Sequence, residues 1–430
     1  MDSASIIEHT MHLIIQLSVI LFAAKLGGEF AQRFLRMPPV LGELAAGVII
    51  GPFALGAFAI PGYGPLFPNV LATISPHSGS LPISSELYAL SQVASIVLLF
   101  VIGLETDLRQ FVRYAGPAFG VALGGVILPF ALGLAGTALL SSSLLGKPLG
   151  FTSPEALFMA AAMTATSIGI TARVLTDMNA IDTPEGVTIV AAAVMDDVVG
   201  IIILTVVVGV SLTGAISASN IAWVSFKAIA FWLVLTGVGI WTAPYISSFI
   251  KRFTVGGAPI GIFLALAFLA AGLSEFMGLA LIIGAYSMGL ALSRTDLAHN
   301  VRDQFDAIFH ALVPIFFVVM GMLVDVRVMA DALSFGIAIT VLATLGKVLG
   351  SGLPATLTGF NMRGSWRIGF GMLPRGEVGL IIAGIGLSRG AIGQDIFGVA
   401  IFMTVITTVI ASIALVPLFR WDGSGRRNPL

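Results

Sequence analysis

Long apolar runs alternate with short polar connections along the whole chain of 430 residues. A transmembrane helix needs about 20 mostly apolar residues. Thirteen runs approach or reach that length, and they cover residues 6–26, 39–58, 91–105, 115–141, 154–175, 186–212, 220–249, 258–274, 278–293, 305–324, 332–358, 367–388 and 396–419. The pattern predicts an all-α polytopic membrane protein with about thirteen transmembrane helices.

The runs divide into six, one and six, with residues 220–249 as a linker helix between the two halves. Runs 154–175 and 367–388 hold corresponding places in the halves, and polar residues and glycine interrupt both of them. The linker makes the second half cross the membrane in the opposite direction to the first. Inverted repeats with paired discontinuous helices are typical of secondary transporters. The sequence therefore predicts a 6+1+6 inverted repeat, inferred from the pattern and not from residue identity between the halves.

The basic residues follow the same order of crossings. Of the 21 Lys and Arg residues, fifteen fall at one set of run ends and connections, three at the opposite set, and three (Lys227, Lys347 and Arg375) within runs. Cytoplasmic loops carry an excess of Lys and Arg, so we expect the N-terminus outside and the C-terminus in the cytoplasm of a prokaryotic inner membrane. The one long connection, residues 59–90, holds no Lys or Arg. We expect it outside, as a plain loop or with a short surface helix.

Composition narrows the class of protein. The chain is 57% hydrophobic and 10% charged, whereas a soluble domain carries about 25% charged residues. A net charge of −1 gives no basic surface for nucleic acid. With no cysteine and no metal spacing among the five histidines, we expect no cofactor. The first twelve residues lack the basic region and cleavage site of a removable signal peptide.

Two adjacent carboxylates, Asp196 and Asp197, lie near the middle of run 186–212. An acidic side chain at mid-membrane depth costs on the order of 3 kcal/mol on insertion scales. Neighbours on a helix point about 100° apart, so one carboxylate can face a cavity while the other faces a partner helix. Such a pair titrates as a coupled unit, and one member can hold either a proton or a cation. The alternative is structural, with one carboxylate solvated in a crevice and the other in an ion pair.

Hydroxyl side chains interrupt run 154–175, where Thr164 and Ser167 fall in the sequence MTATSIGIT. If the helix breaks here, hydroxyl and freed carbonyl oxygens offer ligands for a hard cation. The alternative is an unbroken helix in which these small residues serve packing and bond to their own backbone.

Charged residues also lie inside two later runs. Pro374 removes a helix donor beside Arg375 and Glu377, and these two charges neutralise each other or the broken helix ends. Glu377 is equally open to a role in lining the ion path. Lys347 is nearly central in its run, and Asp196 is the obvious partner carboxylate. The alternative for Lys347 is a water-filled crevice with no specific role.

Six motifs in order carry a resemblance to a known family. They are PPVLGELAAGVIIGP, LLFVIGLETDL, TATSIGITARVL, VMDDVVGII, PIFFVVMGM and LPRGEVGL, between about residues 38 and 390. Together they resemble the second branch of the cation:proton antiporter superfamily, and most closely the bacterial sodium/proton antiporters with paired aspartates. The resemblance implies thirteen spans, two crossed discontinuous helices, a homodimer, and a role in pH homeostasis.

The same resemblance implies a division of labour along the chain. A mobile core would move against a dimerisation domain in an elevator-like cycle. The dimerisation domain would comprise residues 1–105 and 258–324, the core residues 115–212 and 332–419, and the linker helix residues 220–249.

The resemblance also assigns roles to individual residues. Asp197 would bind sodium and protons, while Asp196 would pair with Lys347. Thr164 and the backbone around Ser167 would belong to the first broken helix. The charges of the second broken helix would be Arg375 and Glu377.

The resemblance also implies the function: a secondary-active sodium/proton antiporter and not an enzyme, with electrogenic exchange of two protons per sodium ion as in members with paired aspartates. A potassium/proton antiporter of the same fold is the alternative, although the potassium-efflux relatives usually lack the paired aspartates. An intramembrane aspartyl protease would need a GxGD motif and an ATP-driven pump a GxxxxGK[ST] motif, and neither occurs. A channel fits less well, because an inverted repeat with coupled carboxylates favours alternating access.

Overall fold

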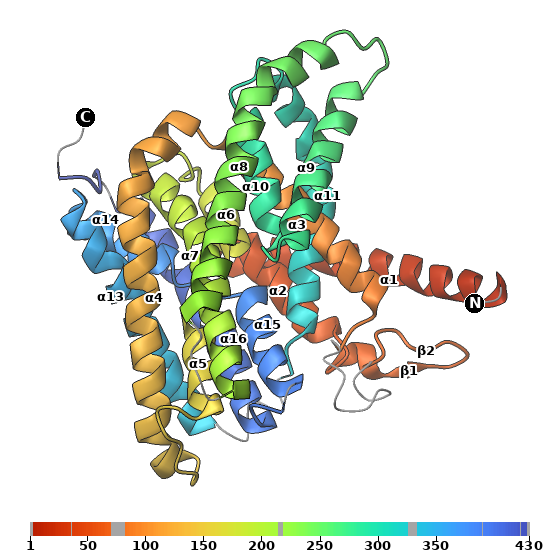
Figure 1. Cartoon of the computed structure of the whole chain (residues 1–430). Coiled ribbons are helices and arrows are strands. Elements are labelled where there is room, and N and C mark those ends of the chain that lie inside the picture. Colours follow the sequence, from red (N-terminus) through yellow and green to blue (C-terminus); the bar gives the residue numbers. More distant parts are fainter. Residues whose placement is uncertain are drawn as a thin grey trace. The chain divides into compact units, whose positions relative to one another are not determined.

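The computed structural model describes residues 3–35, 37–69, 82–213, 218–325, 333–388, 390–421 and 423–427, and helices dominate these ranges (Figure 1). The first elements are α1 (Ser3–Phe30), a π-helical turn (Ala31–Leu35), α2 (Pro39–Ile50), a 3-10 turn (Leu55–Ala57), β1 (Ala59–Ile60), β2 (Gly64–Pro65) and α3 (Ser85–Glu105). The middle of the chain forms α4 (Leu108–Leu144), α5 (Pro154–Thr164), α6 (Ile168–Asp177), α7 (Pro184–Thr213), α8 (Ala218–Ile250), α9 (Ala258–Phe276) and α10 (Leu281–Leu292). The last elements are α11 (Ala298–Met322), α13 (Leu333–Leu357), α14 (Met362–Gly371), α15 (Glu377–Ser388) and α16 (Gln394–Arg420).

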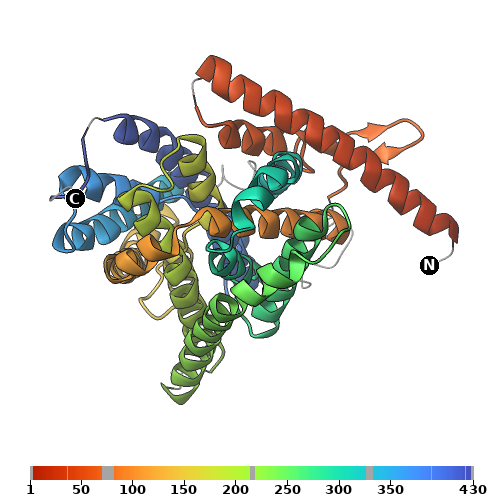
Figure 2. The same cartoon turned by 90° about the horizontal axis from the view of Figure 1, so that it is seen from above.

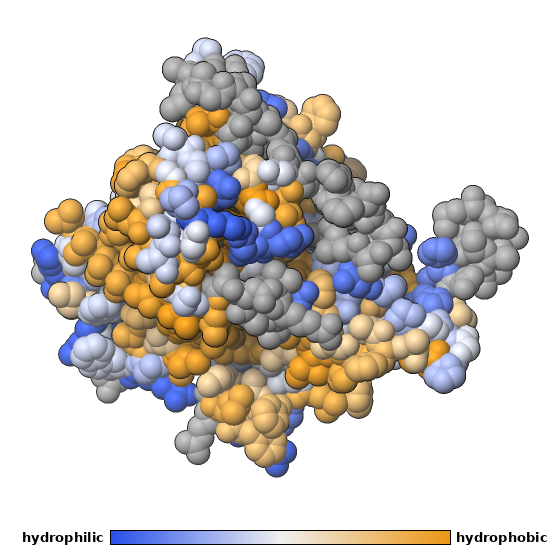
Figure 3. Space-filling model, turned by 90° about the horizontal axis from the view of Figure 1, so that it is seen from below, coloured by the Kyte–Doolittle hydropathy of each residue, from blue (hydrophilic) through white to orange (hydrophobic). Residues whose placement is uncertain are grey.

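Membrane-spanning length is widespread among these helices. Eleven described segments are long and apolar enough to cross a membrane, and two shorter apolar helices, Leu281–Leu292 and Val378–Leu387, add to them. Broad hydrophobic areas lie open on the surface, as side chains that face lipid would (Figure 3). The prediction of an all-α, multi-pass membrane protein is confirmed. Thirteen as the number of crossings stays a prediction.

Helix boundaries depart from the apolar runs where polar residues continue a helix. Helix α3 begins at Ser85, six residues before the start of run 91–105. The hydroxyl of Ser84 accepts a hydrogen bond from the Leu87 amide at 3.3 Å, which satisfies one of the free amides at the helix start. A search for apolar runs detects only the apolar part of such a helix and misses its polar first turns.

The described chain divides into two compact units. One consists of Met1–Ser95 with Ala307–Arg327, and the other of Ile96–Asp306 with Val328–Leu430. Each unit is built around its own closely packed helices.

In the first unit, α1 is one long helix with α2 packed along its C-terminal part (Figure 2). Glycine makes this close approach possible. A Cβ atom on Gly42 would lie 1.9 Å from the Gly27 carbonyl oxygen, and one on Gly47 would lie 2.0 Å from the Val318 carbonyl oxygen. Small residues at such contacts let helix backbones touch, which is how membrane helices gain packing energy.

The long connection after α2 contains a short hairpin. Ala59 pairs with Pro65 and Ile60 with Gly64. The turn between the strands is possible because Gly62 adopts φ +79°, a left-handed conformation that side chains disfavour. The sequence predicted a plain loop or a surface helix here, since two-residue strands leave no periodic signal. Residues 70–81 of this connection lie outside the described residues.

In the second unit, α4 packs along α13 and also contacts α5 and α7 (Figure 1). The contact between α4 and α13 is close at Gly124 and Gly350. A Cβ atom on Gly350 would lie 2.4 Å from the Gly124 carbonyl oxygen. Lys347, one of the charged residues of the interior, lies on α13 of this helix pair.

Two membrane segments of the second unit are discontinuous, as the sequence predicted. The first is interrupted at residues 165–167, between α5 and α6, and the second at residues 372–376, between α14 and α15. The interruptions meet, because the Ser167 amide donates a hydrogen bond to the Pro374 carbonyl at 2.8 Å. The fold therefore contains the two crossed discontinuous helices that its sequence pattern and family resemblance implied.

Candidate ion-binding site

Asp196 and Asp197 lie on α7, which runs without interruption past the two broken helices. The helix begins with Pro184 at its first position, and the Thr183 hydroxyl accepts a hydrogen bond from the Gly186 amide at 3.1 Å. Only 3% of Asp196 and 4% of Asp197 is exposed. Two carboxylates enclosed in this way need compensating charge, since a buried anion without it is costly.

Lys347 on α13 supplies that charge to Asp196. Its ammonium is fully buried and lies 3.1 and 3.2 Å from the two carboxylate oxygens. It also donates to the Thr164 carbonyl at 2.5 Å and to the Gly125 carbonyl at 2.9 Å. The ammonium therefore joins α4, α5, α7 and α13 at one point.

Arg375, in the second break, lies against the end of the first broken helix. Its guanidinium donates to the Ala162 carbonyl at 3.2 Å and to the Met163 carbonyl, and it is 1% exposed. These are among the last carbonyls of α5, which have no partner within the helix because α5 stops at Thr164. Arg375 and Lys347 therefore place two cations at the negative end of the α5 dipole.

The end of α14 is satisfied by neutral groups instead. The Thr171 hydroxyl donates to the Gly371 carbonyl at 2.9 Å, and the Thr166 hydroxyl donates to the Met372 carbonyl at 3.1 Å. The Thr166 hydroxyl is also within reach of the Asp196 carboxylate. Each broken helix thus supplies the partners that the other one lacks, which keeps both interruptions intact in a medium with no water to replace them.

Thr408 on α16 holds the second break from its other side. Its hydroxyl accepts a hydrogen bond from the Arg375 amide at 3.1 Å and donates one to the Arg375 carbonyl. The sequence gives no indication that Thr408 holds the second break. A threonine in an apolar run carries no signal, because it can equally bond to its own helix.

Most residues predicted for the site come together in the second unit. The side chain of Thr164 donates to the Ala161 carbonyl at 2.8 Å, and Ser167 caps α6 by accepting from the Ile170 amide at 3.5 Å. Glu377 is the first residue of α15. The side chain of Glu377 lies outside the described part of the chain.

A second buried ion pair ties the same elements together away from the aspartates. The Arg367 guanidinium of α14 lies 2.6 Å from the Glu185 carboxylate at the start of α7. It also donates to the Leu418 carbonyl at 2.9 Å and to the Trp421 carbonyl at 2.6 Å. In the sequence, Arg367 is only a basic residue at the start of run 367–388, because its partner Glu185 lies 182 positions away.

The two breaks bring the Thr166 hydroxyl and the Thr164 carbonyl to the Asp196–Lys347 pair, next to Asp197 on α7. Carboxylate, hydroxyl and carbonyl oxygens are ligands that suit a hard cation. Among the described residues, no group of three or more His, Cys, Asp or Glu side chains is arranged to hold a metal ion. Within the described part of the chain, a cation at this site would therefore be held by the Asp196–Asp197 pair together with neutral oxygens.

Comparisons with known proteins agree with this arrangement. The family model described as "Sodium/hydrogen exchanger, transmembrane" matches residues 18–421. The chain is 35% identical over 419 residues to the high-affinity Na⁺/H⁺ antiporter NhaS3 of Synechocystis sp., covering 93% of this chain and 88% of that protein. It is 34% identical over 397 residues to the Na⁺/H⁺-K⁺ antiporter GerN of Bacillus cereus, covering 92% of this chain and 93% of GerN.

The fold is shared with a solved structure. The sodium proton antiporter MjNhaP1 of Methanocaldococcus jannaschii superimposes with a TM-score of 0.68 at 19% sequence identity. The match covers 96% of this chain and 99% of that one. At this identity the likeness establishes the common fold.

Proposed function

This chain belongs to the sodium/hydrogen exchanger family and is a secondary transporter, and on that premise we propose that it exchanges Na⁺ for H⁺ by competition of the two ions for Asp197. NhaS3 is named as a Na⁺/H⁺ antiporter, and its 35% identity to this chain supports sodium as the cation. GerN is named for potassium as well, so potassium/proton exchange remains the second candidate.

One observation carries the proposal: two adjacent carboxylates, Asp196 and Asp197, are buried together on α7 with the Lys347 ammonium bonded to the first of them. Lys347 is bonded to both oxygens of Asp196, at 3.1 and 3.2 Å. The charge of Asp196 is thereby balanced inside the protein, and a second buried carboxylate, Asp197, follows it directly on α7. A bare carboxylate at this depth costs on the order of 3 kcal/mol, and either a proton or Na⁺ removes that cost.

Alternating access follows from the burial of Asp197. Because Asp197 is only 4% exposed, its carboxylate cannot exchange ions with water on both sides of the membrane at once. Helices must therefore move to expose it first to one side and then to the other. We propose that a core of residues 115–212 and 332–419 performs this motion against a dimerisation domain of residues 1–105 and 258–324, in a homodimer. The N-terminus would lie outside, and the exchange would be electrogenic, with two protons per sodium ion.

The direct test is uphill transport by the wild-type protein. Proteoliposomes with an imposed pH gradient should accumulate radioactive sodium against its own concentration gradient. The flow of protons down the pH gradient through Asp197 supplies the free energy for this uptake. Addition of potassium to the same assay should leave sodium uptake unchanged. Sodium that only equilibrates would indicate a channel, and equal competition by potassium would favour the second candidate.

Replacing Lys347 with Gln is expected to change the proton-to-sodium ratio and to lower the thermal midpoint. The variant leaves Asp196 without its cation, and breaking a buried pair typically costs about 3–5 kcal/mol. The ratio is measured from the membrane potential that balances a set sodium gradient. Lys227→Gln, a half-exposed lysine of α8, is the matched control. A Lys347→Gln protein with wild-type ratio and midpoint would remove Lys347 from the mechanism.

A further inference from the structure

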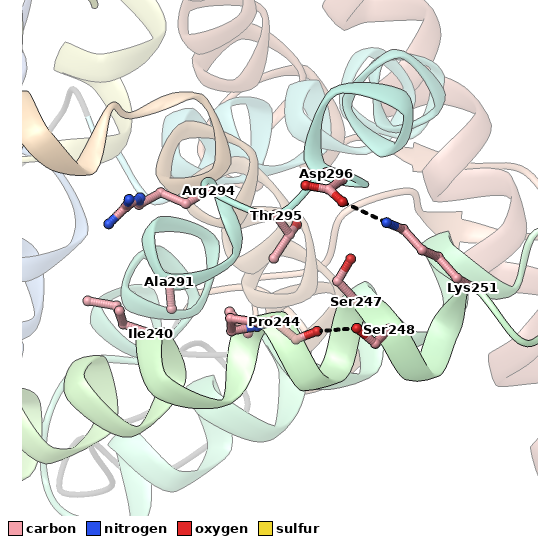
Figure 4. A pocket seen from close by; sticks show the side chains of 10 residues that line it. Ile240, Pro244, Ser247, Ser248, Lys251, Ala291, Arg294, Thr295 and Asp296 are labelled. Atoms are coloured by element: carbon pink, nitrogen blue, oxygen red, sulfur yellow. Dashed lines mark hydrogen bonds and ion pairs between the residues drawn. The ribbon is translucent and has the colours of Figure 1, made fainter.

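A second polar site lies away from the aspartates, between α8 and α10. A cavity of about 340 Å³ opens where α8 ends and α10 leads into its following turn (Figure 4). One end of the cavity is lined by apolar side chains, Ile240, Pro244 and Ala291. The other end is lined by hydroxyl and charged side chains, including Ser247 and Lys251. The cavity is therefore complementary to an amphiphile, with one apolar end and one polar end.

The hydroxyl of Ser247 lines the cavity without a hydrogen-bond partner among the described residues. The residue is 5% exposed. It points towards the space between Lys251 and Thr295 (Figure 4). The neighbouring hydroxyl of Ser248 is used differently, since it donates to the Pro244 carbonyl at 2.9 Å. Leaving a buried hydroxyl unsatisfied is unfavourable, so a ligand with hydrogen-bonding oxygens would stabilise this end of the cavity.

The lining of the cavity carries more basic than acidic side chains. Lys251 and Arg294 both line the cavity, against one carboxylate, Asp296. The Lys251 ammonium lies 2.6 Å from Asp296, and its hydrogen bond lowers the pKa of that carboxyl. Arg294 extends away from this pair (Figure 4). Asp296 is 81% exposed in its side chain, so water can hydrate it readily if an anion takes its place on Lys251.

Aromatic side chains place the cavity at the membrane surface. Trp241, Tyr245 and Phe249 recur every fourth residue on α8 and are 69%, 67% and 56% exposed. Exposed Trp and Tyr mark the boundary between lipid chains and water. Lys251 lies about 9 Å further along the helix direction than Tyr245, at a rise of about 1.5 Å per residue. The polar end of the cavity then falls at headgroup depth, and the apolar end beside the acyl chains.

We propose that this cavity binds the phosphate of an anionic phospholipid. The phosphate replaces Asp296 as the partner of Lys251 and accepts a hydrogen bond from the Ser247 hydroxyl. An acyl chain packs against Pro244 and Ile240 of α8. Basic pockets between membrane helices are known to suit anionic headgroups. The same phosphate chemistry could be offered by free inorganic phosphate, which lacks the apolar part that the other end of the cavity accommodates.

The test measures lipid binding to the purified full-length protein by native mass spectrometry. Phosphatidylglycerol, phosphatidylcholine and inorganic phosphate are titrated in separate arms. Lys251→Gln should weaken phosphatidylglycerol binding about tenfold, the scale of one charge-assisted hydrogen bond, and Ser247→Ala should weaken it less. Asp296→Asn should strengthen binding, because it removes the competing carboxylate. Arg252→Gln, an exposed neighbour that does not line the cavity, and Ser248→Ala should leave it unchanged.

Three results would overturn the proposal. Equal binding of phosphatidylcholine would show that the anionic headgroup is not recognised. Equal losses in Lys251→Gln and Arg252→Gln would reduce the effect to general surface charge. Binding of inorganic phosphate with the same dependence on Lys251 and Ser247, and without a gain from the lipid, would identify a soluble anion as the ligand. If Lys251→Gln fails to fold, the gain expected for Asp296→Asn still decides the matter.

Discussion

Asp197→Asn is expected to abolish sodium-driven proton flux in proteoliposomes while leaving the protein folded. Asparagine keeps the shape of the side chain but can neither release a proton near neutral pH nor offer a full negative charge to Na⁺. The loss should be at least about 100-fold, since a neutral amide at membrane depth replaces the carboxylate for which Na⁺ and H⁺ are proposed to compete. Flux is followed with a pH-sensitive dye inside the vesicles, after a sodium pulse, at several pH values.

The thermal stability of Asp197→Asn should rise or stay constant although its transport is lost. The variant relieves the desolvation cost of a buried carboxylate and leaves the bonds between Lys347 and Asp196 in place, so the thermal midpoint of Asp197→Asn should equal or exceed that of the wild type. Asp182→Asn, an exposed aspartate between α6 and α7, is the control for amide substitution and should transport normally. Wild-type flux from Asp197→Asn would leave the proposed competition without its binding group.

Arg375→Met is expected to destabilise the protein by about 3 kcal/mol or more, because charge-assisted hydrogen bonds to buried groups contribute about 1.5–3 kcal/mol each. The variant leaves the carbonyls of Ala162 and Met163 without a donor in the membrane interior. It also removes one of the two cations at the end of the α5 dipole. The measurement is thermal or denaturant unfolding of the detergent-solubilised protein, with transport assayed in parallel.

Two further variants separate charge from geometry at this position. Arg375→Lys keeps the charge but has no planar fork to reach several carbonyls, so it should recover only part of the lost stability. Arg420→Met, at the exposed end of α16, should leave the midpoint unchanged. If Arg375→Met melts together with the wild type, the α5 carbonyls do not depend on this guanidinium.

The two broken helices illustrate how far local sequence can be followed. Pro374 removes a backbone donor and predicts an interruption in its own run, and the structure has one there. The interruption at residues 165–167 contains no proline, and the sequence left an unbroken helix open as the alternative. It exists because Thr166 and Ser167 bond to the backbone of the second break, more than 200 positions away.

Charged residues within the membrane were located by sequence, but their partners were only partly identified. Lys347 was assigned to Asp196 because few partners exist for an ammonium in lipid, and the structure pairs them at 3.1 Å. Its bonds to the backbone of Gly125 and Thr164 were not foreseen. Backbone carbonyls are the same at every position, so composition cannot say which one a cation will meet.

The sequence by itself determined that this chain lies in a membrane, that long apolar helices build it, and which few charged side chains must be compensated inside. Those conclusions depend on transfer of single residues from water to lipid, a property each residue carries wherever it stands. Only the tertiary structure decided that α5 ends under Arg375 and Lys347, that Thr408 holds the second break, and that Ser247 faces a basic cavity. Those contacts join segments distant in the chain, and their free energy exists only after the helices have packed.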